Sequence, residues 1–216
     1  MTLEELLNDL PPARVVDLQG TYVPVDMSED NLEIAELDSA SAYEAYIRSL
    51  LDGNRAVAAY GGYLEKRNLY TSELFENDGV RRNIHLGVDI WAPAGTAVLA
   101  PLEGTVHGFD YNAGPGNYGP TIILKHRLGG HQFYTLYGHL DTESIEELEL
   151  GDVYKAGDVL GFLGLPTENG GYAPHLHFQI ICDLEGNTGD YPGVATEEEL
   201  GHFRVNCPDP NLLLKL

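Results

Sequence analysis

Two short segments with polar side chains at alternate positions constrain this chain most. They are residues 85–89 (HLGVD) and residues 175–177 (HLH). Because successive side chains of a β-strand point to opposite faces, a strand over the first segment places His85 and Asp89 on one face. The second segment places His175 and His177 together in the same way. Two such strands lying side by side would gather four nitrogen or oxygen donors, which outlines a metal site.

The residue types of this outline suit zinc. Zn²⁺ binds imidazole nitrogen and carboxylate oxygen, and a catalytic site commonly has three protein ligands and leaves the fourth position to water. Four candidates therefore compete for three places, and the spacing alone does not choose between His175 and His177. The remaining histidine, together with His139, is then available for proton transfer or for stabilising a developing oxyanion.

A longer set of motifs resembles the lysostaphin-type zinc metallopeptidases, also called LytM-like or LasA-like, which cut peptide bonds in bacterial cell walls. The motifs are residues 83–90 (NIHLGVDI), 92–96 (APAGT), 100–104 (APLEG), 137–140 (YGHL) and 174–178 (PHLHF). This resemblance implies that His85, Asp89 and His177 bind zinc. It also implies that His139 and His175 flank the open coordination position as acid/base groups.

The resemblance implies a function as well. We expect a zinc-dependent metalloendopeptidase whose activated water attacks a peptide bond of a peptide or peptidoglycan-derived substrate. The alternative is a non-catalytic or regulatory intracellular zinc-binding domain of the same fold. Degenerate members typically lose one or more of the five site residues, and all five are present here. Candidate walls of a substrate groove are Tyr118, Tyr137 and Tyr172.

The fold expected for the chain is mainly β. An N-terminal extension, residues 1–78, lacks the site motifs, and residues 79–216 form the expected metallopeptidase domain. That domain should be an antiparallel β-sandwich similar to a barrel-sandwich hybrid, and the extension should be small and α+β. Strands are expected at residues 87–91, 97–101, 104–109, 121–126, 133–139, 159–163 and 175–181, separated by turns rich in glycine and proline.

Two helices are expected in the extension. Thr2 and Glu5 form a capping pair for a helix that stops before Pro11. Ser41 and Glu44 resemble a second capping box, which would open a helix closing near Gly53. Its apolar residues recur at helical spacing, so we expect them to pack against the metallopeptidase domain.

A carrier function is excluded by the lysines. Residues 98–106 (VLAPLEGTV) and 156–161 (AGDVLG) resemble the two halves of biotinyl or lipoyl carrier domains. A carrier needs an exposed lysine at a hairpin tip, usually between methionines. The methionines of this chain are Met1 and Met27, and neither Lys125 nor Lys155 lies in that context.

The strongly negative net charge argues against nucleic acid and anionic membranes as partners. The chain has 12 basic and 34 acidic residues, a formal net charge of −22, so nucleic acid and anionic membranes should repel it. The N-terminus begins with the acidic MTLEE where a signal peptide would be basic, and no apolar run approaches the ~20 residues that span a bilayer. We therefore expect a cytoplasmic location. Cys182 and Cys207 belong to no CxxC pair and are expected to be structural.

Overall fold

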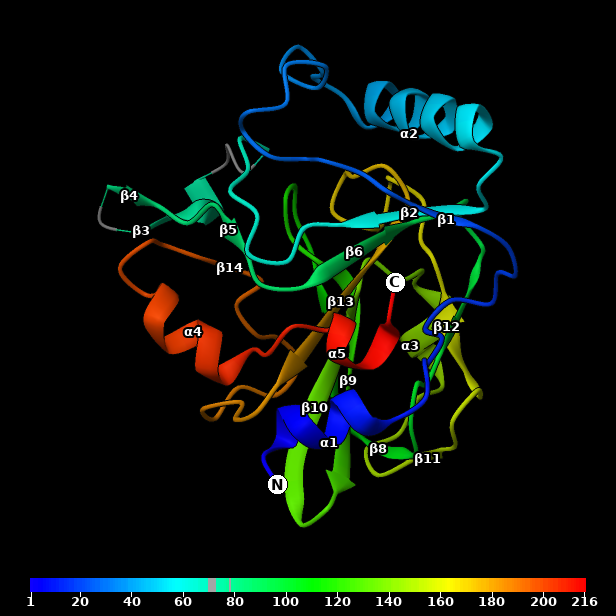
Figure 1. The fold of residues 1–216 in the computed structure, drawn as a ribbon, viewed down its shortest axis with the longest axis vertical. Coiled ribbons are helices and arrows are strands. Elements are labelled where there is room, and N and C mark those ends of the chain that lie inside the picture. Colours follow the sequence, from blue (N-terminus) through cyan, green and yellow to red (C-terminus); the bar gives the residue numbers. More distant parts are fainter. Residues whose placement is uncertain (70–72, 78) are drawn as a thin grey trace.

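A single eight-stranded sheet forms the centre of the molecule (Figure 1). The computed structural model describes residues 1–69, 73–77 and 79–216. The strands of the main sheet, in spatial order, are β1 (Tyr22–Pro24), β2 (Ala58–Gly61), β6 (Val88–Trp91), β13 (His175–Ile181), β10 (His131–Gly138), β9 (Gly119–Leu128), β8 (Gly104–Asn112) and β11 (Val153–Tyr154). Neighbouring strands are antiparallel, except that β1 and β2 are parallel.

Shorter elements surround this sheet. The paired small strands are β7 (Ala97–Leu99) with β12 (Val159–Phe162), β5 (Ile84–His85) with β14 (Val194–Ala195), and β3 (Glu76–Asn77) with β4 (Val80–Arg81). The α-helices are α1 (Leu3–Asp9), α2 (Ala40–Asn54), α3 (Glu143–Glu146), α4 (Leu200–Asn206) and α5 (Asn211–Leu214), and a 3₁₀ turn spans Glu73–Phe75. The expected mainly β fold is confirmed, although the main sheet stays open and does not close into a barrel.

The central strands are buried on both faces. Along β9, Ile122 and Leu124 belong to the larger apolar cluster of the molecule, whereas Ile123 between them belongs to a second cluster. This alternation follows from the period of two along a strand, and it places a packed apolar layer on each side of the sheet. Every residue of β13 is buried, and the strand places His175, His177 and Gln179 on one face and Leu176, Phe178 and Ile180 on the other.

The predicted extension packs directly on the rest of the chain. Strand β2 pairs with β6, and α1 lies beside α5 near the two termini (Figure 1). Leu3 and Leu7 of α1 are buried in the larger apolar cluster. The boundary expected after residue 78 stays a prediction, and Asp78 itself lies outside the described residues.

Of the two N-terminal helix caps expected in this region, one is confirmed and the other is shifted. Thr2 and Glu5 form a reciprocal capping box at α1, which confirms the predicted cap. Helix α2 begins at Ala40, where the hydroxyl of Ser39 accepts a hydrogen bond from the backbone N–H of Ala42. The prediction that Ser41 caps this helix is wrong by two residues, because Ser39 has the extended backbone that a cap requires. Among the described residues, the structure contains no helix long and apolar enough to cross a membrane.

The shared sheet and core lead to a stability prediction. We propose that residues 1–78 and 79–216 unfold as one cooperative unit, because β2 and α1 contribute to the same sheet and apolar cluster as the later strands. Differential scanning calorimetry should therefore give one transition. Two separate transitions, with the second reproduced by residues 79–216 alone, would contradict this proposal.

Candidate metal centre

The candidate site forms where β6 and β13 pair. In their register His177 lies opposite Asp89, and His175 lies opposite Trp91. His85 ends the separate short strand β5, which pairs with β14 instead of the main sheet. The expectation that His85 and Asp89 share one strand is therefore wrong, since the chain bends between β5 and β6. The two side chains nevertheless reach the same point.

Glycine is required at this bend. A Cβ added at Gly87 would lie 2.7 Å from the carbonyl oxygen of Phe178 and 2.8 Å from Cε1 of His177. Both distances are shorter than real Cβ contacts, so any larger residue would push β13 away. Gly87 therefore lets the chain pass directly over the histidine of the neighbouring strand.

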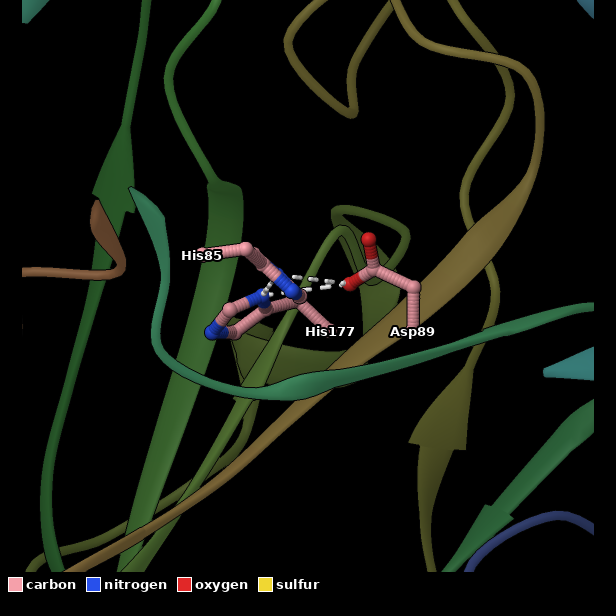
Figure 2. A group of neighbouring side chains, drawn as sticks. All are labelled: His85, Asp89 and His177. Carbon is pink, nitrogen blue, oxygen red and sulfur yellow. Dashed lines mark hydrogen bonds and ion pairs between the residues drawn. The ribbon is translucent and has the colours of Figure 1, made fainter. Parts of the chain in front are cut away.

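Three donor atoms converge in this region, as Figure 2 shows. Oδ1 of Asp89 lies 3.2 Å from Nε2 of His85 and 3.2 Å from Nδ1 of His177. The two imidazole nitrogens lie 2.8 Å from each other. All three side chains are buried. The three residues predicted as metal ligands are therefore brought together by two consecutive strands, β5 and β6, and by the distant strand β13.

Hydrogen bonds on the far sides of both rings indicate their tautomers. Nδ1 of His85 lies 3.0 Å from the carbonyl oxygen of Gly62, and Nε2 of His177 lies 3.0 Å from Oε1 of Gln179. The amide of Gln179 is oriented by its Nε2, which donates to the carbonyl of Pro192. Since these oxygens only accept, each of these ring nitrogens carries the proton. The opposite nitrogens then present lone pairs toward Asp89, and this donor set fits a divalent metal ion.

The charge state of the site agrees with that fit. Burial, followed by the charge of Arg67, lowers the pKa of His85 to about 3, so this imidazole is neutral. Burial opposes ionisation of Asp89, yet the guanidinium of Arg67 beside it holds its pKa well below the usual range. The centre therefore combines the neutral imidazole of His85 with the carboxylate of Asp89, and these are the protonation states in which both residues bind a metal.

The two predicted acid/base histidines lie beside these donors. The ring centroids of His139 and His175 are 4.3 Å apart, and Nε2 of His175 lies 3.8 Å from Oδ1 of Asp89. Nδ1 of His139 donates to the carbonyl of Asn169 at 2.7 Å, and Nδ1 of His175 donates to the carbonyl of Ala173 at 2.8 Å. Burial lowers the pKa of both rings. Each is a neutral imidazole with its Nε2 lone pair available.

An open cavity of about 630 Å³ contains the five residues. Tyr118 and Tyr172 line it, as expected for groove walls, but Tyr137 does not. Tyr137 is fully buried on β10, with its hydroxyl against Thr135, because its position in the strand turns it into the core. Residues of the predicted extension also line the cavity, including Asp38 and Tyr43.

Sequence reasoning missed two polar residues of the centre. Gln179 follows His177 by two positions on β13, so the same period-two pattern would have placed it on the site face. Arg67 is the second, and its guanidinium contacts Asp89. No spacing signal links Arg67 to the motifs, since it lies before them in a segment without regular secondary structure.

The donor set defines a candidate metal centre on a mainly β fold. Residues 83–188 match the model of Peptidase family M23, so this part of the chain is similar to that family. All five predicted site residues and Gln179 lie inside the matched range, whereas Arg67 and the cavity residues of the extension lie outside it.

Comparison with individual proteins gives partial matches. The chain is 35% identical to DD-carboxypeptidase/endopeptidase Mpg of Neisseria meningitidis over 96 residues, which is 44% of this chain and 20% of that protein. It is 32% identical to peptidoglycan DD-endopeptidase ShyC of Vibrio cholerae over 167 residues, 76% of this chain and 33% of that protein. The catalytic domain of lysostaphin from Staphylococcus simulans is 26% identical, with a TM-score of 0.41, over 67% of this chain and 91% of that one. The chain thus spans no more than a third of either curated relative.

Proposed function

We propose that this chain is a zinc-dependent metalloendopeptidase that hydrolyses peptide bonds in peptidoglycan-type peptides. The observation that carries the proposal is the convergence of two imidazole lone pairs and one carboxylate oxygen next to two further neutral histidines in an open cavity. A purely structural metal site would be closed by a fourth protein ligand, whereas this group holds three candidates among the residues that the structure describes.

The roles follow from the atoms that each residue presents. Nε2 of His85, Oδ1 of Asp89 and Nδ1 of His177 would hold the zinc ion. Bound zinc would supply a Lewis acid that lowers the pKa of a water molecule and polarises the peptide carbonyl. The carbonyl of Gly62 and the amide of Gln179 keep the two ligand rings in the required tautomers.

His139 and His175 would move the proton. Each has Nδ1 tied to a backbone carbonyl, so each can accept a proton only at Nε2. One ring would take the proton of the attacking water at Nε2 and pass it to the leaving amine. The other, after taking up a proton from solvent at Nε2, would hydrogen-bond the oxygen on which negative charge develops. The geometry alone does not divide these two tasks between the rings.

The substrate class rests on the relatives. Two of them are named for carboxypeptidase or endopeptidase activity, one explicitly on peptidoglycan. We propose the same class of substrate for this chain. The alternative, a non-catalytic zinc-binding domain, predicts stoichiometric zinc with no cleavage of either sacculi or soluble muropeptides. Mass spectrometry of digests by the wild-type protein, with His175→Ala as the inactive control, separates the two functions.

The acidic charge leads to a prediction about substrate size. A net charge of −22 should weaken encounter with an anionic wall at low salt, where screening extends over ~30 Å at 0.01 M but ~10 Å at 0.1 M. Soluble muropeptides should therefore be cut faster than intact sacculi, and added salt should narrow the gap. Rates measured on both substrates across this salt range test the expectation. Faster cleavage of intact wall at low salt would contradict it.

The cytoplasmic location expected from the sequence stays a prediction. It fits an enzyme acting on soluble muropeptides, which is the substrate form that the charge favours. Fractionation of cells producing the full-length natural protein would test it, and recovery outside the cytoplasm would show that location to be wrong.

A further inference from the structure

Arg67 lies outside the matched family range and contacts the oxygen of Asp89 that does not face His85 and His177. We propose that Arg67 is a positioning residue that fixes the carboxylate of Asp89, so that only one of its oxygens faces the metal position. The proposal rests on the zinc centre proposed above. Arg67 belongs to the predicted extension, whereas the ligand that it would orient, Asp89, belongs to the predicted metallopeptidase domain.

The two oxygens of Asp89 have different partners. Oδ1 faces the rings of His85 and His177, each at 3.2 Å. Oδ2 accepts a hydrogen bond from Nη1 of Arg67 at 2.5 Å. A carboxylate rotates readily about its Cβ–Cγ bond when nothing holds it, and it can then bind a metal through one oxygen or through both. The guanidinium occupies Oδ2 and leaves Oδ1 as the donor.

Arg67 is itself held firmly. Its side chain is 2% exposed, and its Nε donates to Oε2 of Glu65 at 2.7 Å. The other oxygen of Glu65 accepts the backbone N–H of Met27 at 2.9 Å. The backbone N–H of Arg67 donates to the carbonyl of Asn83, two residues before His85. The guanidinium therefore joins the predicted extension, through Glu65 and Met27, to a ligand of the centre.

Gly62 packs closely against the guanidinium of Arg67. A Cβ added at Gly62 would lie 1.9 Å from Nη2 of Arg67 and 2.9 Å from Nδ1 of His85. The carbonyl of this same glycine accepts the hydrogen bond from His85. Gly62 thus contacts both the guanidinium of Arg67 and the ring of His85, and a larger residue at this position would displace the guanidinium.

The chemistry favours arginine over lysine at this position. A guanidinium is planar and always charged, and it donates along fixed directions to two carboxylates at once, here Glu65 and Asp89. A lysine ammonium would keep the charge without this fixed geometry. Since outer-shell partners of metal ligands typically contribute 10–100-fold to metal affinity, loss of Arg67 should weaken zinc binding by roughly that factor.

The test is a zinc titration of metal-stripped protein against a competing chelator. We expect Arg67→Met to weaken zinc affinity by roughly 10–100-fold and Arg67→Lys to weaken it less. Lys66→Met is the matched control, because Lys66 carries the same charge one residue away but pairs with the half-buried Glu29 and the exposed Glu197. Its affinity should match that of the wild type. The absorption spectrum of the Co²⁺-loaded proteins should change in Arg67→Met and not in the control.

Each outcome decides the proposal. If Arg67→Met bound zinc as tightly as the wild type, the proposal would be overturned. Tighter binding would also overturn the proposal, because Arg67 would then compete with the metal for Asp89. Circular dichroism checks folding. If Arg67→Met does not fold, Glu65→Gln, which loosens Arg67 without removing it, should weaken binding in the same direction, and unchanged affinity there would overturn the proposal. A wild-type protein that binds no zinc would instead overturn the proposed function.

Discussion

Asp89→Ala is expected to remove zinc and activity together. Oδ1 of Asp89 lies 3.2 Å from both ligand nitrogens, so its loss removes one of three protein donors and the only negative charge among them. The loss in zinc affinity should exceed the 10–100-fold typical of losing an outer-shell partner, and peptide cleavage should fall below detection. Zinc content after dialysis without added metal measures the first effect.

Matched variants make this result specific. Asp110→Ala removes the same charge from an exposed position on β8 and should keep both zinc and activity. His85→Ala and His177→Ala should lose zinc as Asp89→Ala does, whereas His139→Ala should retain it. Unchanged zinc content in Asp89→Ala would show that the ligand assignment is wrong.

Replacing each of the two histidines of β13 by alanine is expected to affect zinc content differently. Nδ1 of His177 lies 3.2 Å from Oδ1 of Asp89, whereas Nε2 of His175 lies 3.8 Å away and its Nδ1 is bonded to Ala173. His175→Ala should therefore keep near-stoichiometric zinc but lose about 10²–10⁴-fold in rate, the usual range for general acid–base catalysis. His177→Ala should lose both.

Zinc analysis and the rate of muropeptide cleavage, measured on the same preparations, test this difference. The reverse metal pattern, with zinc lost only in His175→Ala, would exchange the two roles. Equal zinc and equal rates in His175→Ala and the wild type would remove His175 from the proposed mechanism.

Much of the centre could be predicted because its signals are local. The alternation in residues 175–177 requires only that the segment be a strand, and β13 spans His175–Ile181 as expected. The reciprocal bonds of Thr2 and Glu5 likewise lie within one helical turn. A period of two or a capping spacing is visible in the sequence because the contacts that produce it lie a few residues apart.

What could not be predicted depends on contacts between distant segments. Arg67 meets Asp89 only because Lys66 pairs with Ile84, which brings the arginine next to the residues that lead into β6. The position of His85 on a strand of its own depends on its partner β14, which lies more than a hundred residues later. The core position of Tyr137 depends on which face of β10 turns inward. None of these three arrangements produces a periodic pattern of residues that could be recognised in the sequence.

The most direct test of the central claim is mass spectrometry of muropeptides incubated with three preparations at equal concentration. These are zinc-loaded wild type, metal-stripped wild type, and zinc-treated His177→Ala. The account predicts new peptide termini in the first, none in the other two, and recovery of cleavage when zinc is returned to the stripped wild type. Cleavage that persists in the stripped protein or in His177→Ala would contradict a zinc-dependent peptidase, and so would a zinc-loaded wild type that leaves every peptide intact.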